Sequence, residues 1–178
     1  MKCIRFHHHG GPEVLRLEEL DDPLPGPGEV VVDVKAISVN HLDIWIRKGL
    51  PGLPVKLPRI PGADASGIVR SVGANVTNVK PGDRVLLNPN ISCGHCPFCT
   101  GGEGSCCPEY GIMGEHCDGT YRSAFAVNAD RLIPFPPALS FEEAAAAPLV
   151  TLTAWRMLVT KARIQPAEDV LILGAGAG

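Results

Sequence analysis

The sequence has no long apolar run and no excess of basic residues, and each absence excludes a class of protein. No stretch approaches the about 18 apolar residues in a row that a membrane-spanning helix needs. The 16 Lys and Arg residues are scattered among 19 Asp and Glu, giving a net charge of −3 and no basic face for nucleic acid. We therefore expect neither a membrane nor a nucleic-acid partner.

The N-terminal residues also lack the apolar core of a secretory signal, because Lys2 and Arg5 interrupt the segment from Met1 to Phe6. Seven cysteines is an odd number, which does not suit a complete disulfide framework. Because disulfides form in oxidising compartments, reduced cysteines and the missing signal predict a cytoplasmic protein.

Glycine and proline are abundant instead, with 20 and 17 residues in a chain of 178. That length allows one domain with a sizeable core, and the turn residues between short Val- and Ile-rich runs predict a mainly β fold. Asn40 and Gly49 are expected to cap a helix over 41–48. The predicted strands cover residues 2–7, 14–18, 29–39, 68–72, 84–87, 119–127 and 131–133.

The segment from Pro61 to Gly67 is crowded with small residues. Small residues let a backbone pass close to another backbone or to a ligand, although a tight bend alone would use them too.

Cys93, Cys96 and Cys99 follow one another with two residues between neighbours, and a fourth cysteine follows at Cys106 or Cys107. This spacing is typical of four thiolates that close on one zinc ion at about 2.3 Å, with no position left for water or substrate. Disulfides or plain buried thiols are the alternatives. The spacing favours a structural zinc site that holds a loop together.

Near the C-terminus, Ser140 and Glu143 form a capping-box pattern that opens a helical region. A short apolar strand over 169–173 then enters Gly174, Gly176 and Gly178, a turn that lets a pyrophosphate approach a helix N-terminus. Because the rest of that fingerprint would lie beyond Gly178, we expect a fragment whose nucleotide-binding half is missing. The expected division is 1–139, 140–168 for linking helices, and 169–178.

The cysteine loop, the segment 61–67 and the glycine turn together resemble the medium-chain dehydrogenase/reductase superfamily. Gly-Pro-Gly-Glu-Val at 26–30 and Lys-Pro-Gly-Asp-Arg-Val at 80–85 match the family pattern in order, as does Cys-x-x-Cys-x-x-Cys-x7-Cys-Pro at 93–108. The chain looks like the N-terminal GroES-like domain of a zinc-type alcohol dehydrogenase or quinone oxidoreductase. The resemblance implies a partly open barrel and selects Cys107 as the fourth zinc ligand.

The same resemblance implies a catalytic zinc in alcohol dehydrogenases, but its ligands are absent here. Asn40 stands where the family has a cysteine, Ala63 where it has a histidine, and no cysteine occurs in 148–153. Only His41, Asp43 and Asp64 remain as donors, a poor set for an open zinc site. Quinone oxidoreductases of the superfamily work without this zinc.

By resemblance, Asn40 would contact substrate or nicotinamide, His41 would lie near the cofactor phosphates, and Thr151 or Thr153 would face the nicotinamide. Each has an ordinary alternative: a helix cap for Asn40, a surface position for His41, and helix packing for the threonines. Asp64 is a remnant of the zinc site, a hydrogen-bond anchor or a proton carrier, and we favour the anchor.

The sequence thus predicts part of an NAD- or NADP-dependent oxidoreductase that reduces quinones or activated double bonds, with one structural zinc. The small-molecule substrate would be a carbonyl, a quinone or an alcohol, and the full-length protein a homo-oligomer. The alternatives are an alcohol dehydrogenase with unusual catalytic ligands and, for this piece alone, an inactive zinc-stabilised β domain.

Overall fold

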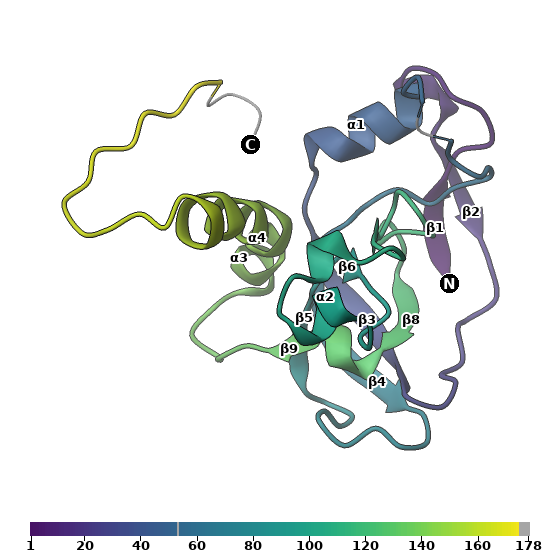
Figure 1. Ribbon diagram of the computed structural model, residues 1–178. Coiled ribbons are helices and arrows are strands. Elements are labelled where there is room, and N and C mark those ends of the chain that lie inside the picture. Colours follow the sequence, from purple (N-terminus) through teal and green to yellow (C-terminus); the bar gives the residue numbers. More distant parts are fainter. Residues whose placement is uncertain (53, 175–178) are drawn as a thin grey trace.

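A computed structural model describes residues 1–52 and 54–174 of the chain (Figure 1). Its centre is a five-stranded antiparallel sheet in the order β8-β3-β4-β5-β9. The strands are β3 (Glu29–Ile37), β4 (Ala65–Val72), β5 (Arg84–Leu87), β8 (Ala124–Asn128) and β9 (Leu132–Pro134). The predicted mainly β fold is confirmed.

One face of this sheet carries the main core. Val30 and Val32 of β3 are fully buried, and they cluster with Phe125 of β8 and Leu87 of β5. Alternate residues of a strand point to the same face, so Val30 and Val32 put their side chains into one apolar layer. Burying each such side chain contributes roughly 1.5–3 kcal/mol relative to leaving it in water.

The N-terminal part adds a second, smaller layer. Strands β1 (Lys2–Arg5) and β2 (Arg16–Glu19) pair antiparallel, and the short 3-10 helix η1 (Pro12–Val14) lies between them. Helix α1 (His41–Lys48) follows β3 and buries Ile46 against Phe6. The strands predicted over 2–7 and 14–18 are thus present as a shorter antiparallel pair, and the helix from 41 to 48 is present as predicted.

A lobe projects from the sheet between β5 and β8 and contains the cysteine loop. It comprises β6 (Asn90–Ile91), the single helical turn α2 (Pro97–Thr100), the 3-10 turn η2 (Gly104–Cys106) and β7 (Gly111–Ile112). Strands β6 and β7 pair with each other at its base. No residue from 91 to 106 is buried, so apolar packing does not hold this lobe together.

The helices after the sheet begin as predicted. Ser140 Oγ accepts a hydrogen bond from Glu143 N at 3.1 Å, and Glu143 Oε2 accepts one from Ser140 N at 2.8 Å, which caps α3 (Phe141–Ala146). Helix α4 (Pro148–Trp155) continues directly into the π-helical segment η4 (Arg156–Lys161). The short 3-10 turn η3 (Ala129–Arg131) lies earlier in the chain, between β8 and β9. No helix in the described ranges is long and apolar enough to cross a membrane.

The segment after η4 differs from expectation. The sequence predicts a buried strand over 169–173, whereas the structure has no regular element there and leaves Leu171 and Leu173 85% exposed. In Figure 1 this stretch is an irregular trace that lies apart from the sheet. A strand requires a hydrogen-bonded neighbour, and none of the described segments lies beside it to act as one. Gly176 and Gly178 lie outside the described residues.

Candidate functional site

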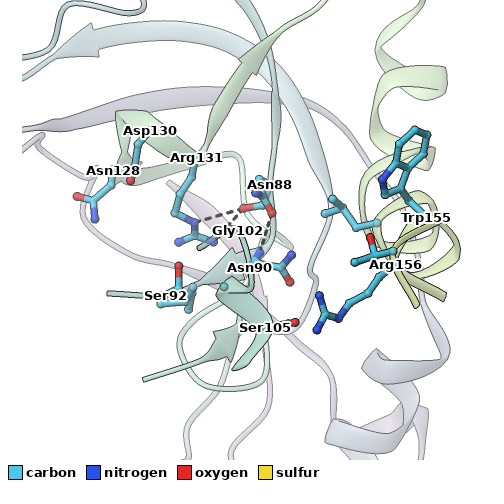
Figure 2. Close-up of a pocket in the computed structure, with 14 residues that line it drawn as sticks. Asn88, Asn90, Ser92, Gly102, Ser105, Asn128, Asp130, Arg131, Trp155 and Arg156 are labelled. Atoms are coloured by element: carbon cyan, nitrogen blue, oxygen red, sulfur yellow. Dashed lines mark hydrogen bonds between the residues drawn. The ribbon is translucent and has the colours of Figure 1, made fainter. Parts of the chain in front are cut away.

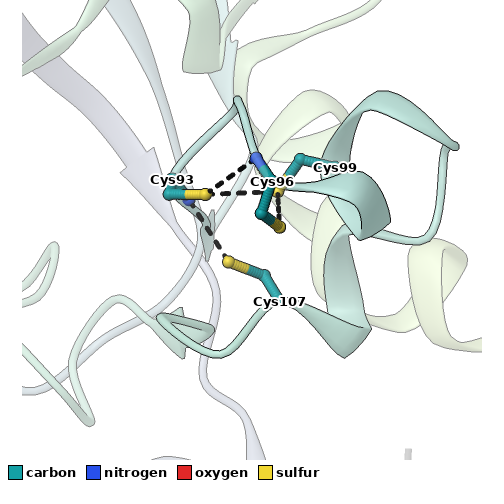
Figure 3. A group of neighbouring side chains, drawn as sticks. All are labelled: Cys93, Cys96, Cys99 and Cys107. Atoms are coloured by element: carbon teal, nitrogen blue, oxygen red, sulfur yellow. Dashed lines mark hydrogen bonds between the residues drawn. The ribbon is translucent and has the colours of Figure 1, made fainter.

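Four cysteine sulfurs meet in the projecting lobe (Figure 3). The Sγ atoms of Cys93, Cys96, Cys99 and Cys107 all lie within 4.8 Å of one another. Cys93 Sγ is 3.9 Å from Cys99 Sγ, and Cys96 Sγ is 3.5 Å from Cys99 Sγ. Sulfurs at about 2.3 Å from a tetrahedral zinc are about 3.8 Å apart, so this donor set fits a closed zinc site.

Backbone N–H groups surround these sulfurs. Cys96 N donates to Cys93 Sγ at 3.3 Å, Glu109 N donates to Cys107 Sγ at 3.3 Å, and Cys93 N lies 3.5 Å from Cys107 Sγ. Such donors favour thiolates and fix the ligands in place. They lower the pKa of Cys93, with the N–H groups of His95 and Cys96 as the main causes.

The four thiols cannot all ionise easily without a cation. Although burial opposes ionisation of Cys99, hydrogen bonds from the Cys96 thiol and the Gly94 N–H lower the pKa of Cys99 to about 7. The Cys99 N–H favours the Cys96 thiolate, but burial and the neighbouring sulfurs raise the pKa of Cys96 to about 11. A divalent cation at the centre would remove this conflict between like charges.

Cys106 does not join the cluster. Its exposed Sγ lies 3.6 Å from Arg156 Nη2 of η4 and 3.9 Å from Glu103 Oε2. Glu103 also accepts from Arg156 Nη2 at 2.6 Å, so this ion pair connects the lobe to η4. The structure therefore brings Cys107 to the other three sulfurs and turns Cys106 away from them.

Asp64 forms a second centre, at the edge of the sheet beside α1. Its side chain is fully buried, and its two carboxylate oxygens accept three hydrogen bonds. Oδ2 accepts from Ser38 Oγ at 2.7 Å and from Asn40 Nδ2 at 2.9 Å. Oδ1 accepts from Leu149 N at 3.0 Å, in the first turn of α4. We call Ser38, Asn40, Asp64 and Leu149 the Asp64 network.

Asp64 also provides a hydrogen-bond acceptor for a backbone N–H group at the start of α4. The N-terminal N–H groups of a helix have no intrahelical partner, and the residue before α4, Ala147, carries no side chain that caps it. A carboxylate near a helix N-terminus is favoured by the helix dipole as well. Asp64 thus fixes the start of α4 from 85 residues away in the sequence.

Asp43 is the second buried carboxylate of this region. Oδ1 accepts from Gly62 N at 2.9 Å, and Oδ2 accepts from Asn40 N at 2.8 Å and from Tyr121 Oη at 3.1 Å. Burial raises the pKa of Asp43, against the lowering effect of these donors. A Cβ atom at Gly62, where φ is +101°, would lie 2.4 Å from Tyr121 Cδ1. A Cβ atom at Gly67 would lie 2.2 Å from the backbone oxygen of Asp33, so the predicted close approach of the segment 61–67 to another backbone is present.

In the described part of the chain, the side chains of the remaining predicted residues do not hydrogen-bond to Asp64. His41 is exposed on α1, with its ring centroid 5.5 Å from that of Trp45. Thr151 is exposed on α4, and the Thr153 hydroxyl donates to Leu149 O at 2.9 Å, within its own helix. Gly174 has a positive φ of +74°, and a Cβ atom there would meet no atom of the described residues within 4 Å. The structure thus brings Asn40 and Asp64 together but neither His41 nor the threonines.

A cavity of about 370 Å³ lies between the lobe and α4 (Figure 2). Arg131 and Asn88 line one side of it, and Trp155 and Arg156 line the other. Arg131 Nη2 donates to Asn88 O at 3.2 Å and to Pro89 O at 3.1 Å, so its main function is to hold the backbone of the lobe. Of the residues predicted for catalysis or cofactor binding that lie within 1–52 and 54–174, none lines this cavity.

Similarity to a known family identifies the fold. Residues 26–137 match the model of the alcohol dehydrogenase GroES-like domain. The chain belongs to this family. Within this GroES-like domain, the matched range covers the sheet, the four-cysteine lobe and all of the Asp64 network except Leu149, and it ends before α3.

Relatives of this GroES-like chain include both alcohol dehydrogenases and quinone oxidoreductases. It is 38% identical to an alcohol dehydrogenase of Schizosaccharomyces pombe, covering 97% of this chain and 49% of that protein. It is 35% identical to quinone oxidoreductase 1 of Escherichia coli, covering 98% of this chain and 45% of that protein. A solved NAD-dependent alcohol dehydrogenase superposes with a TM-score of 0.91 at 48% identity, covering 95% of this chain and 49% of that one. The chain spans about half the length of the relatives it matches.

Three residues of the site are not identifiable from the sequence. Ser38 ends a strand pattern, Leu149 contributes only its backbone N–H, and Tyr121 lies inside a segment that reads as a strand. Their partners are 26, 85 and 78 residues away in the sequence. A strand or helix pattern describes near neighbours only, so it contains no signal for these contacts.

Proposed function

We propose that this GroES-like chain is part of an NAD(P)-dependent oxidoreductase that reduces quinones or activated double bonds without a catalytic metal. The four cysteines would hold one structural zinc, and the nicotinamide would bind near Asn40. The relatives support the wider class, since both alcohol dehydrogenases and quinone oxidoreductases match nearly the whole chain.

The observation that carries the proposal is the hydrogen bonding of Asp64. Where alcohol dehydrogenases of the superfamily have catalytic zinc ligands, this chain has Asn40 and Ala63, and Asp64 gives both carboxylate oxygens to protein donors. A metal ion there would have to displace three hydrogen bonds of a fully buried side chain. Among the described residues, no group of three or more His, Cys, Asp or Glu side chains close enough to hold a metal includes Asp64 or His41.

Hydride transfer to a conjugated substrate suits such a site. Reduced nicotinamide supplies the hydride when it is bound, and a quinone or enone spreads the resulting negative charge over its own framework. A proton from solvent then completes the reduction, so that one hydride and one proton add across the conjugated system. A simple alcohol would lack a Lewis acid to stabilise its alkoxide.

The structural zinc is proposed on the geometry of the lobe. Four sulfurs at tetrahedral spacing leave no open position, so a bound ion would stabilise the lobe and take no part in the reaction. Cys93 is also near His95 and Glu109, but that group shares Cys93 with the sulfur cluster and consists otherwise of exposed side chains. We therefore assign the zinc to Cys93, Cys96, Cys99 and Cys107.

The proposed division into a catalytic domain, linking helices and the start of a nucleotide-binding domain places Gly174, Gly176 and Gly178 at the cofactor pyrophosphate. Residues of α4, among them Thr151 and Thr153, would then face the nicotinamide. On this proposal the 178-residue chain alone would be inactive, because most of the cofactor site lies outside it.

The test uses the full-length protein that contains this chain. Elemental analysis after exhaustive dialysis should give one zinc per chain, and NADH or NADPH should be oxidised in the presence of a naphthoquinone or a cyclic enone. Oxidation of ethanol or benzyl alcohol by NAD⁺ or NADP⁺ should be far slower. The Asp21→Asn variant, at an exposed position, serves as the control for handling and metal content.

Two results would overturn the proposal. Two tightly bound zinc ions per chain, together with loss of one ion and of alcohol oxidation in Asp64→Ala, would establish an alcohol dehydrogenase with unusual ligands. Absence of zinc from an active protein would remove the structural zinc site.

A further inference from the structure

We propose that Cys93, His95 and Glu109 form an open metal site on the surface of the lobe, through which zinc enters and leaves the four-cysteine site. We call these three residues the entry site. Zinc would bind to them only in transit and would come to rest at the four sulfurs. The inference rests on the proposed function only for the presence of zinc at those sulfurs.

The entry site shares one ligand with the four-cysteine site. Cys93 Sγ, a ring nitrogen of His95 and a carboxylate oxygen of Glu109 all lie within 4.8 Å of one another. Cys93 Sγ also lies within 4.8 Å of the other three sulfurs. Thiolate, imidazole and carboxylate groups are all zinc ligands. A zinc ion can therefore pass from one group to the other without losing its bond to Cys93.

Exposure to solvent decreases from the entry site to the four sulfurs. His95 and Glu109 are exposed, Cys93 is partly buried, and Cys107 is only 5% exposed. Three protein ligands leave a fourth position for water, as in an open zinc site, whereas four sulfurs fill every position. A closed site needs an entry path. An ion arriving from water meets the exposed ligands first, so the path runs through Cys93.

The ring of His95 is oriented for binding a metal. His95 Nδ1 lies 2.8 Å from the backbone oxygen of Cys93. A carbonyl oxygen can only accept a hydrogen bond, so Nδ1 carries the proton and donates it. The other ring nitrogen, Nε2, then has the free lone pair that a metal requires. A hydrogen bond from one ring nitrogen to a backbone carbonyl is the usual way in which metal-binding histidines are oriented.

The backbone groups of His95 and Glu109 support the four sulfurs independently of their side chains. Glu109 N donates to Cys107 Sγ at 3.3 Å, and the His95 N–H donates to Cys93 Sγ. Substituting either side chain leaves these backbone donors in place. The role of the two side chains in zinc entry can therefore be tested while the surroundings of the sulfurs are kept.

The transfer exchanges ligands and changes no oxidation state. On entry, zinc replaces water ligands with Cys93 Sγ, His95 Nε2 and a Glu109 oxygen, and keeps water in the fourth position. It then releases the nitrogen, the carboxylate oxygen and the water, and binds the other three sulfurs. Each thiol that binds zinc releases its proton to solvent. Exit is the reverse, and each freed sulfur takes up a proton from solvent.

Zinc exchange in the full-length protein tests the entry site, because the lobe begins and ends the experiment with zinc bound. The protein with its natural zinc is mixed with an excess of an isotopically enriched zinc salt under reducing conditions. The isotope ratio of the bound zinc is followed by mass spectrometry. We expect His95→Asn and Glu109→Gln each to slow the exchange at least about 10-fold, because each removes one ligand of the entry site. Asparagine can still donate to Cys93 O but has no counterpart of Nε2.

The Kd for zinc separates a ligand used in transit from a residue that stabilises the lobe. A group that binds zinc only in transit changes the rates of entry and exit by the same factor and leaves their ratio unchanged. We expect the Kd, measured by competition with a chelator, to stay within about threefold of the parent value in both variants. A residue that only stabilised the lobe would raise the Kd when substituted.

Two variants serve as controls. Glu103→Gln removes a carboxylate charge from the same lobe, at a residue that pairs with Arg156 and lies outside the entry site. His8→Asn removes an exposed histidine elsewhere in the chain. Both should exchange zinc at the parent rate. If Glu103→Gln slowed exchange as much as Glu109→Gln, attraction of zinc by negative charge would explain the effect and the inference would be overturned.

The inference is also overturned if His95→Asn and Glu109→Gln exchange zinc at the parent rate. Faster exchange together with a higher Kd would show that the two side chains only stabilise the lobe, which would overturn it as well. A protein that binds no zinc at the four cysteines would refute the proposed structural zinc together with this inference. Parent-like exchange in variants that carry one zinc per chain would refute the entry site alone.

Discussion

The four-cysteine lobe and the Asp64 network both tie chain segments together, yet they use different chemistry over different distances. The lobe gathers four sulfurs from residues 93 to 107, and no residue from 91 to 106 is buried. The Asp64 network joins residues 38, 40 and 149 around a carboxylate that is fully buried beside the sheet. A metal suits the first case and hydrogen bonds the second.

The difference has a physical cause. An exposed loop buries too little apolar surface to offset the entropy of ordering its backbone, about 1–2 kcal/mol per residue, so it needs a strong local cross-link. Around Asp64 the sheet already supplies apolar burial, and the interior strengthens each hydrogen bond. The comparison predicts that the lobe depends on metal and that the network depends on one charged side chain.

Removing a cysteine ligand should have the largest effect. Cys107→Ser should lower zinc affinity by more than about 100-fold. Even mutating a residue that only hydrogen-bonds to a metal ligand typically lowers metal affinity about 10- to 100-fold. Limited proteolysis of the variant, or of the parent protein after chelator treatment, should cut first within residues 93–110 and leave the sheet intact.

Cys106→Ser is the matched control, because it removes the neighbouring thiol that points to Glu103 and Arg156. It should retain zinc and protease resistance. If Cys106→Ser lost zinc and Cys107→Ser kept it, the ligand assignment would be wrong; equal resistance with and without chelator would argue against zinc in the lobe.

Removing the Asp64 carboxylate should be the next largest effect. Asp64→Ala removes the acceptor of three half-buried donors, and of these Asn40 Nδ2 keeps another partner, Ser38 Oγ at 3.3 Å. Each donor that is left without a partner costs about 1–3 kcal/mol. We expect the free energy of unfolding in urea to fall by about 3 kcal/mol, allowing for water reaching some of the donors. The zinc content should not change, which would separate the two regions.

Asp21→Ala, at an exposed carboxylate, is the control for removing a negative charge. Loss of zinc from Asp64→Ala would show that the two regions are not independent. If Asp64→Ala lowered the free energy of unfolding by less than about 0.5 kcal/mol, as a surface substitution typically does, the Asp64 network would contribute little to stability.

Tyr121→Phe should lower the free energy of unfolding moderately and in a pH-dependent way. It removes one of the three donors to Asp43, and a hydrogen bond to a charged group contributes about 1.5–3 kcal/mol. Near pH 7 we expect a loss of about 1.5 kcal/mol in the free energy of unfolding. The loss should be smaller at acid pH, where Asp43 is protonated.

The direction of this pH dependence follows from the difference in the pKa of Asp43 between the folded and the unfolded protein. Burial raises the pKa of Asp43 above its ordinary value in the unfolded chain, so the folded protein retains a proton that the unfolded chain has released. The stabilisation due to that proton is complete below the unfolded pKa and is lost as pH rises through the folded pKa. Tyr121→Phe should raise the pKa of Asp43 in the folded protein further. If the contribution of Asp43 to the free energy of unfolding instead rose with pH between its unfolded and folded pKa values, the raised pKa of Asp43 would be contradicted.

The smallest effect is expected for Glu103→Gln, which removes the ion pair between the lobe and η4. Glu103 Oε2 lies 2.6 Å from Arg156 Nη2 and 3.5 Å from Lys161 Nζ, but the pair is partly exposed and screened by salt. Zinc content and global stability should be unchanged. Hydrogen exchange in η4 should become faster at low salt, and the difference from the parent protein should vanish at about 1 M NaCl, where charges are screened within a few ångströms.

Much of the fold follows from local patterns. The valine-rich run of β3, the Ser140 and Glu143 capping box and the Asn40 and Gly49 ends of α1 each act over a few residues, and each is found as expected. The spacing of the cysteines limits the fourth sulfur to two candidates, and the three-dimensional structure places Cys107 and not Cys106 with the others. The strand over 169–173 is wrong, because apolar residues cannot form a strand without a neighbour.

The local chemistry therefore follows from the sequence alone: a β-rich domain, a four-thiol loop and the caps of α1 and α3. The role of Asp64, by contrast, depends on the tertiary structure. Its three donors come from the end of β3, from the cap of α1 and from the first turn of α4. The sheet brings these segments together, and since hydrogen bonds act over about 3 Å, no pattern along the chain could have shown that they meet.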